Sequence, residues 1–273
     1  MKKPYILLFL GLTLLQACER DFNNPFDPDV MDTVEPKASI LTGPKNNEEV
    51  TASVVQFTWK GNLQNSTFRY KLVDFHEDWS DWLNTTQVRF NGLADMPYTF
   101  LLQERYPTNE VQKDTTSVSF VVNAIDGPAL LFQASQIEVQ NGALFTIKLM
   151  ADELEDVVLV MATLSFNTDM LSLQSVSNSN GDMTKDADAI TFVSTPTSEA
   201  NANGQVEVVM GRFGDTTEGF TGNASLFELI FLAKDTGNTT LEFLTTNNQT
   251  AVKNSKNQTV LMNNFYPINI TIN

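Results

Sequence analysis

Short runs in which apolar and polar residues alternate recur from residue 37 to the end of the chain. Two examples are FRYKLVDF (68–75) and LFELIFLAK (226–234). Side chains of a strand point alternately to its two faces, so a period of two predicts half-buried β-strands. No segment beyond residue 128 has a helical period over several turns. The pattern therefore predicts an all-β protein.

The first group of strands lies within residues 37–125 and has the size of an immunoglobulin-like sandwich, about seven strands in about ninety residues. The pattern FTW…FRYKL…WSDW…VRFNGLADMPYTFLLQ resembles the fibronectin type III-like modules of bacterial surface proteins. This resemblance implies that Trp59 is a core residue and that Tyr98 forms a tyrosine corner. We expect this module to act as a spacer.

Trp79 and Trp82, in the segment EDWSDW, admit two interpretations. Aromatic faces stack on sugar rings, so the pair could form a polysaccharide platform. Alternatively, the two side chains pack over the sheet and its loop, and we favour this interpretation. His76 has no nearby nucleophile pattern and is interpreted as a loop residue.

The segment NAIDGPA (123–129) contains turn formers between strand-like runs and marks a module boundary. Nine apolar or alternating runs follow it: ALLFQ, ALFTIKLM, VVLVMATLSF, MLSLQSV, AITFVST, GQVEVVMGRF, LFELIFLAK, TTLEF and YPINITI. Nine strands with long connections predict a jelly-roll-like β-sandwich over residues 128–273.

Two stretches of this second module are similar to cohesin domains. FTIKLMADELEDVVLVMATLSFNTDMLSLQSVS (145–177) has a strand that leads into a turn at Phe166 and Asn167, followed by Leu171 in a short Leu-rich strand. GNASLFELIFLAKDTGNTTLEF (222–243) carries the Leu-x-x-Leu-x-Phe-x-Ala-Lys strand and a Gly-containing turn. The resemblance implies a non-catalytic module that binds dockerins, small calcium-loaded helical domains, in trans through one sheet face. Carbohydrate-binding modules use a related sandwich.

The alternation along three strands predicts where a partner would bind. In VVLVMATLSF, placing the even-numbered residues in the core leaves Leu159 and Met161 facing outward. The same reasoning turns Val209 outward in GQVEVVMGRF, and Ile230 and Leu232 outward in LFELIFLAK. The resemblance to cohesins implies that these strands are neighbours in one sheet. We therefore expect the five residues to form one exposed apolar patch, large enough to mark an interface.

The N-terminus carries a targeting signal. Two lysines and the apolar run YILLFLGLTLL precede Cys18, the only cysteine of the chain. The run is too short for a membrane span, which needs roughly 20 residues, and so predicts a secretory signal peptide over residues 1–17. The sequence LQAC resembles the lipobox of bacterial lipoproteins, which implies lipidation of Cys18 and a flexible tether over residues 18–36. Glu19 resembles the signal for sorting to the outer membrane.

Composition limits the chemistry. A net charge of −16 and a pI near 4.3 argue against nucleic acid and anionic membrane surfaces as partners. One cysteine and one histidine exclude a disulfide framework, a Cys/His zinc site and a Cys–His nucleophile pair. Acidic residues fall mainly in loops and at outward strand positions, where solvation explains them without a pair of catalytic carboxylates. The run ADELED offers calcium four carboxylates with a spacing that fits no calcium loop, from Asp152, Glu153, Glu155 and Asp156.

We therefore expect no enzyme and no cofactor or metal, but a lipid-anchored protein at the outer membrane or cell surface. Its cohesin-like module would dock a dockerin-bearing or similar secreted protein. One alternative is a polysaccharide-binding lipoprotein, which requires an exposed aromatic row, yet the second module has no tryptophan and only Tyr266. The other alternative is a purely structural stalk of the cell envelope, which would bind no ligand.

Overall fold

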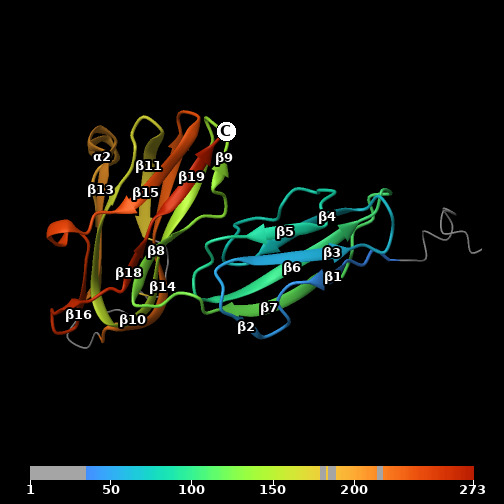
Figure 1. The fold of residues 1–273 in the computed structure, drawn as a ribbon, viewed down its shortest axis with the longest axis horizontal. Helices are drawn as coiled ribbons and strands as arrows, with labels where there is room; N and C mark the ends of the chain where they lie inside the picture. Colours follow the sequence, from blue (N-terminus) through green and yellow to red (C-terminus); the bar gives the residue numbers. More distant parts are fainter. Residues whose placement is uncertain (1–34, 179–182, 184–188, 214–217) are drawn as a thin grey trace, which may run out of the picture. The chain divides into compact units, whose positions relative to one another are not determined.

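β-Strands make up almost all of the regular structure in the computed structural model (Figure 1). The structure describes residues 35–178, 183, 189–213 and 218–273. The predicted signal peptide, Cys18 and the tether as far as residue 34 lie outside the described residues. Within the described ranges, no helix has the length and apolar character needed to cross a membrane. The predicted all-β class is confirmed.

Residues 39–122, all of them described, form seven strands in two sheets, which we call the first sandwich. The strands are β1 (Ser39–Thr42), β2 (Glu48–Val50), β3 (Val55–Lys60), β4 (Thr67–Leu72), β5 (Gln87–Phe90), β6 (Pro97–Arg105) and β7 (Thr116–Val122). One sheet has the order β1-β3-β5 and the other has the order β2-β7-β6-β4. The number of strands agrees with the prediction.

Aromatic side chains fill the space between these two sheets. Phe57 of β3 stacks on Phe100 of β6, with ring centroids 4.0 Å apart, and so connects one sheet to the other. Trp59 is buried in the same cluster, as predicted. Tyr98 is also buried, and its hydroxyl donates a hydrogen bond of 3.2 Å to the carbonyl oxygen of Ala94. A bond from a tyrosine hydroxyl to the backbone a few residues upstream is the contact of a tyrosine corner.

The described part of the chain from residue 129 onward forms twelve strands, which we call the second sandwich. They are β8 (Ala129–Gln133), β9 (Glu138–Val139), β10 (Leu144–Ser165), β11 (Leu171–Asn178), β12 (Ala189–Ser194), β13 (Gln205–Phe213), β14 (Phe220–Ala233), β15 (Gly237–Phe243), β16 (Ala251–Asn254), β17 (Thr259–Val260), β18 (Asn264–Tyr266) and β19 (Ile268–Ile272). Two of the nine predicted runs are joined in β10. The strands β9, β16, β17 and β18 are too short for the alternation to reveal them.

β10 takes part in both layers of the second sandwich. Its first half pairs with β14 and β8, and its second half pairs with β13 and β16. The register shifts between the halves, where Glu153 and Asp156 have positive φ values of 52° and 55°. Such bulges bend a strand and let it change sheets. The bulges also change which residues of β10 point into the core. Odd-numbered residues such as Ile147 are buried in the first half, and even-numbered residues such as Val160 are buried in the second half.

The core of the second sandwich lies between these layers. The rings of Phe192 on β12 and Phe227 on β14 are 5.7 Å apart, so the sheet that contains β13 packs against the sheet that contains β14. The end of β10 also pairs with β15, so the strand order continues from β10 through β15 and β19 to β9, and Figure 1 shows β15 and β19 side by side. Short helices are α2 (Thr197–Asn203) and the 3-10 turn η2 (Thr246–Asn248). α2 ends at Gly204, whose φ of 69° is a left-handed cap, and it is too short to give a helical period.

Candidate functional site

An apolar row crosses three neighbouring strands of the second sandwich. Val209 on β13 lies opposite Met161 on β10 and, on its other side, opposite Val193 on β12. Residues directly opposite each other in antiparallel strands place their side chains on the same face. Val193 is 57% exposed, whereas Met161 and Val209 are partly exposed. These three side chains therefore form a continuous apolar row that solvent reaches.

The next row extends this surface with Phe213. Leu159 on β10 lies opposite Gly211 on β13, which offers no side chain. A Cβ atom added at Gly211 would lie 2.7 Å from a ring carbon of Phe213 and 3.2 Å from Cδ1 of Leu159. The Phe213 ring, 47% exposed, thus covers Gly211 beside Leu159. We call the surface made by Leu159, Met161, Val193, Val209 and Phe213 the β13 face.

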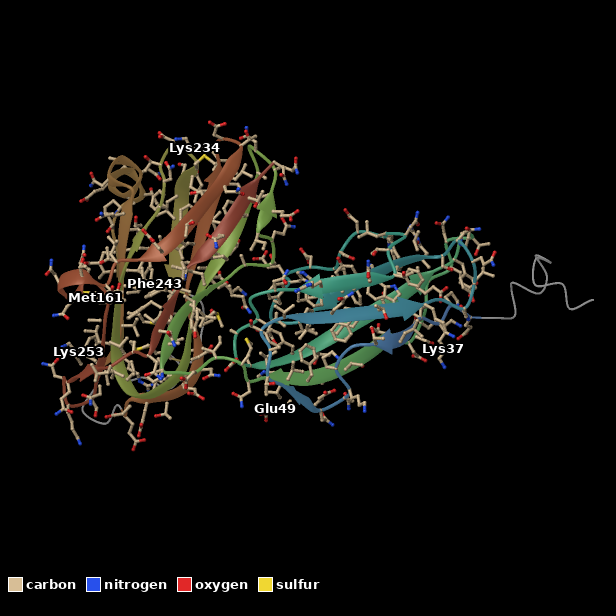
Figure 2. The ribbon with its side chains drawn as sticks, in the orientation of Figure 1. Lys37, Glu49, Met161, Lys234, Phe243 and Lys253 are labelled. Atoms are coloured by element: carbon tan, nitrogen blue, oxygen red, sulfur yellow. The ribbon has the colours of Figure 1, made fainter. Side chains whose placement is uncertain are left out.

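Polar groups border the β13 face. Lys253 on β16 lies opposite Leu159, and Figure 2 shows Lys253 and Met161 along the same outer side of the sandwich. Exposed Glu207 lies two residues before Val209 on β13. Thr163, which the alternation predicts to face solvent, is buried instead, because its hydroxyl donates a 2.8 Å hydrogen bond to the carbonyl of Gln249. The β13 face is thus an apolar area with a charged border, the usual composition of a docking surface.

Two of the five predicted site residues lie elsewhere. Ile230 and Leu232 face outward as predicted, but β14 pairs with the first half of β10. Leu232 lies opposite Leu144, which is 64% exposed, and Ile230 lies opposite Thr146. We call the surface made by Leu144, Ile230 and Leu232 the β14 face. The strand pairing therefore divides the predicted patch between two sheets, because the bulges of β10 move its second half away from β14.

The alternation contains the signal for one residue that the prediction omits. Phe192 packs against the core, so Val193, its neighbour on β12, must point to the other side of the sheet. Phe213 is different, because its ring lies over a glycine of its own strand. No periodic pattern reveals such a contact in advance.

The two tryptophans of the first sandwich lie against arginines. The guanidinium carbon of Arg69 is 4.8 Å from the ring centroid of Trp79 and 4.8 Å from that of Trp82. Arg105 lies 4.6 Å from the ring centroid of Trp82. Arg69 also donates two hydrogen bonds to the side-chain oxygen of Gln103. These rings take part in cation–π packing, the arrangement that the packing interpretation requires.

The four acidic residues of the ADELED run have separate surroundings. Asp152 is buried, whereas Glu153 and Glu155 are exposed. Asp156 accepts a 2.6 Å hydrogen bond from the hydroxyl of Ser255. Among the described residues, no group of three His, Cys, Asp or Glu side chains lies in a metal-holding arrangement.

His76 lies in the turn after β4, where its Nδ1 accepts a 3.2 Å hydrogen bond from the backbone N–H of Leu72. Burial, and then the positive charge of Lys71, lower the pKa of His76.

Comparison with known proteins finds distant similarity to solved structures only. No protein-family model matches the chain, and none of the curated proteins matches it. Solved cohesin structures do match part of it. A type II cohesin domain from the cellulosome of Acetivibrio cellulolyticus has a TM-score of 0.46 at 7% identity, covering 54% of this chain and 95% of that one. A non-cellulosomal cohesin from the archaeon Archaeoglobus fulgidus has a TM-score of 0.40 at 14% identity, covering 53% and 90%.

A third match is a cohesin from Acetivibrio cellulolyticus in complex with a dockerin, with a TM-score of 0.43 at 12% identity, covering 52% of this chain and 98% of that one. Identities and TM-scores this low assign this chain to no family. They do not decide what this chain binds.

Proposed function

We propose that this chain is a non-catalytic binding lipoprotein whose second sandwich docks a protein partner through the β13 face. The carrying observation is the continuous row of Val193, Val209 and Met161 across three strands, together with the Phe213 ring over Gly211. Exposed apolar areas with a polar border are characteristic of protein interfaces. In this proposal the first sandwich is a fibronectin-like spacer.

The proposed partner is a dockerin-bearing or similar secreted protein. The motifs of residues 145–177 and 222–243 that resemble cohesins motivate this choice. The apolar character of the β13 face indicates the partner's chemistry, because Met161 and Val209 offer no hydrogen bonds. A helix with an exposed apolar stripe satisfies this requirement, because its apolar face can cover an apolar surface. Since few charges take part, we expect the affinity to change little between low and physiological salt.

Titration calorimetry with a panel of purified dockerin modules tests this proposal. We expect Met161→Asp to weaken binding by about 2 kcal/mol, roughly thirtyfold, because a carboxylate would be desolvated at the centre of the interface. The matched control is Leu41→Asp, which places the same charge at a 57% exposed leucine on β1 of the first sandwich. Equal affinity of Met161→Asp and the wild type would exclude the β13 face as the interface.

The proposed anchor is a lipid on Cys18, supported by the apolar run and the LQAC sequence before it. Several acyl chains bind a protein stably to a membrane without a transmembrane helix. Metabolic labelling with a palmitate analogue should tag the wild type, and Cys18→Ala should release the protein into the soluble fraction. An untagged, soluble wild type would contradict the anchor and leave the docking proposal intact.

A further inference from the structure

A buried carboxyl group lies where the two sandwiches meet. Both sandwiches belong to one compact unit, Pro36–Asn273. Asp152, on β10 of the second sandwich, is 1% exposed. Its Oδ2 accepts a 3.4 Å hydrogen bond from the backbone N–H of Asp95, in the segment between β5 and β6 of the first sandwich. Its Oδ1 is buried and has no hydrogen-bond partner among the described residues. A buried ionised carboxylate with an unsatisfied oxygen is costly.

The second carboxyl at this junction, that of Asp95, already accepts hydrogen bonds through both of its oxygens. Asp95 is 4% exposed, and its two oxygens accept the backbone N–H groups of Ala124 and Ile125, at 2.8 and 2.9 Å. These residues begin the link between the sandwiches. Asn223 of β14 donates its side-chain N–H to the backbone carbonyl of Asp95. Asp95 therefore stays in place beside Asp152 and brings a second carboxyl into the same buried region.

The surrounding groups offer Asp152 little charge compensation. Tyr98 of β6 faces it, but the tyrosine hydroxyl accepts a hydrogen bond from Gln133 of β8 and donates one to Ala94. On β10 itself, Glu153 adds a second acidic group that acts on Asp152, and Lys148 lines the neighbouring cleft. The Lys148 amino group lies 3.8 Å from a carboxylate oxygen of Glu228 and so is already paired.

Apolar packing and a cleft flank the two carboxyls. Ala94 and Met96 of the first sandwich pack against Leu131 and Met150 of the second. A cleft of about 690 Å³ is lined by Asp95, Gln133, Met150 and Ser225. Both carboxyls are buried, but the cleft reaches Asp95, so water lies close to Asp152 when the contact loosens.

We propose that Asp152 is a proton-binding site that controls the contact between the two sandwiches, which is closed when this carboxyl is neutral and loosened when it ionises. In the closed form, the neutral acid still accepts the N–H of Asp95 and places no second charge beside the Asp95 carboxyl. On ionisation, the carboxylate is better solvated by water in the cleft than by its protein neighbours. The second sandwich then gains freedom relative to the first without losing its own core.

The sign of the pH effect follows from the direction of the shift. Burial, and then the neighbouring Asp95 carboxyl, raise the pKa of Asp152 from 3.8 to about 7. In the opened form the carboxyl regains its ordinary acidity, so between pH 4 and pH 7 the closed form binds a proton that the opened form has released. The closed contact therefore weakens as pH rises through this range, and the weakening is complete above pH 7. The upper limit is about tenfold in the open-to-closed ratio for each pH unit.

Hydrogen–deuterium exchange of the full chain tests this inference. The amides of Asp95, Ala124 and Ile125 report on the junction, and the Phe100 amide reports on the core of the first sandwich. After correction for intrinsic exchange, we expect protection of the junction amides to fall at least about fivefold between pH 5.5 and pH 7.5, within the linkage limit. Protection of Phe100 should not change. Junction amides that keep their protection over this range would overturn the proposal, whatever the variants do.

Asp152→Asn provides the second measurement. The amide keeps an acceptor for the Asp95 N–H and cannot ionise, so junction protection should become independent of pH. The matched control is Asp81→Asn, which removes one negative charge at an exposed position of the first sandwich and should retain the wild-type pH dependence. Identical pH dependence in the wild type and a folded Asp152→Asn chain would exclude Asp152 as the group responsible.

Discussion

The β13 face and the β14 face are both outer surfaces of the second sandwich, and β10 contributes to each. On the β13 face, Met161 lies in one row with two valines, so three strands supply apolar side chains in succession. On the β14 face, Leu232 has Leu144 on one side but Ser172 of β11 on the other. β13 and β14 have a similar alternation of apolar residues, but the strands beside β13 place apolar side chains next to it, whereas β11 places a serine next to β14. A continuous apolar area needs agreement among strands, which no single strand provides.

The adjacent cross-strand rows of the two faces differ in the same way. Ile230 lies between Thr146 and Ser175, whereas Leu159 has the Phe213 ring beside it. The Lys148–Glu228 ion pair follows directly on the β14 face. Hydroxyl and charged groups on that face remain well solvated when no partner is bound. We therefore expect the β13 face to lose binding on substitution and the β14 face to tolerate it.

The largest expected effect is the difference in stability between a substitution on the buried side of β10 and one on its outer side. Val160 is completely buried, and Val160→Asp should destabilise the second sandwich by about 4 kcal/mol or more, because it buries an unpaired charge. Met161→Asp, one residue along, should cost about 1 kcal/mol or less, since its side chain reaches solvent. Chemical denaturation of both variants measures the difference. Comparable losses would mean that Met161 belongs to a covered surface.

An intermediate effect is expected where a glycine positions an aromatic ring. Gly211→Ala would bring a methyl group to 2.7 Å from the Phe213 ring and so displace it from the β13 face. We expect partner affinity to fall by about 1 kcal/mol, roughly fivefold, through loss of one aromatic contact. Gly142→Ala is not a suitable control, because the φ of Gly142 is 83°. Phe213→Ala is the suitable comparison, because it removes the ring directly and should give a similar loss of partner affinity.

The smallest expected effect concerns the β14 face. Leu232→Asp should change partner affinity by less than about 0.5 kcal/mol, because Leu232 lies outside the β13 face. The same titrations used for Met161→Asp measure it. A loss as large as that of Met161→Asp, in a variant with wild-type stability, would restore a shared interface that includes both faces.

The sequence predicts which side chains of each strand point inward with good accuracy. Val160, Ala162 and Leu164 are buried, as are Val208, Met210, Leu229 and Phe231. The corresponding outward residues Met161, Val209, Ile230 and Leu232 are all partly exposed. Alternation is local, because the geometry of an extended chain turns each side chain away from the next. Thr163 departs from the rule because a distant segment, at Gln249, covers it.

What the sequence alone determines is therefore the class of the chain, its turn-bounded strands and the parity of each strand. The tertiary structure decides which strands become neighbours. It places Val193 beside Val209, separates Ile230 from Met161 at the bulges of β10, and buries Asp152 against Asp95. The physical reason is that strand pairing and burial join residues that are far apart in sequence. Whether a side chain meets solvent, a partner strand or another carboxyl depends on those distant residues, and no local period records them.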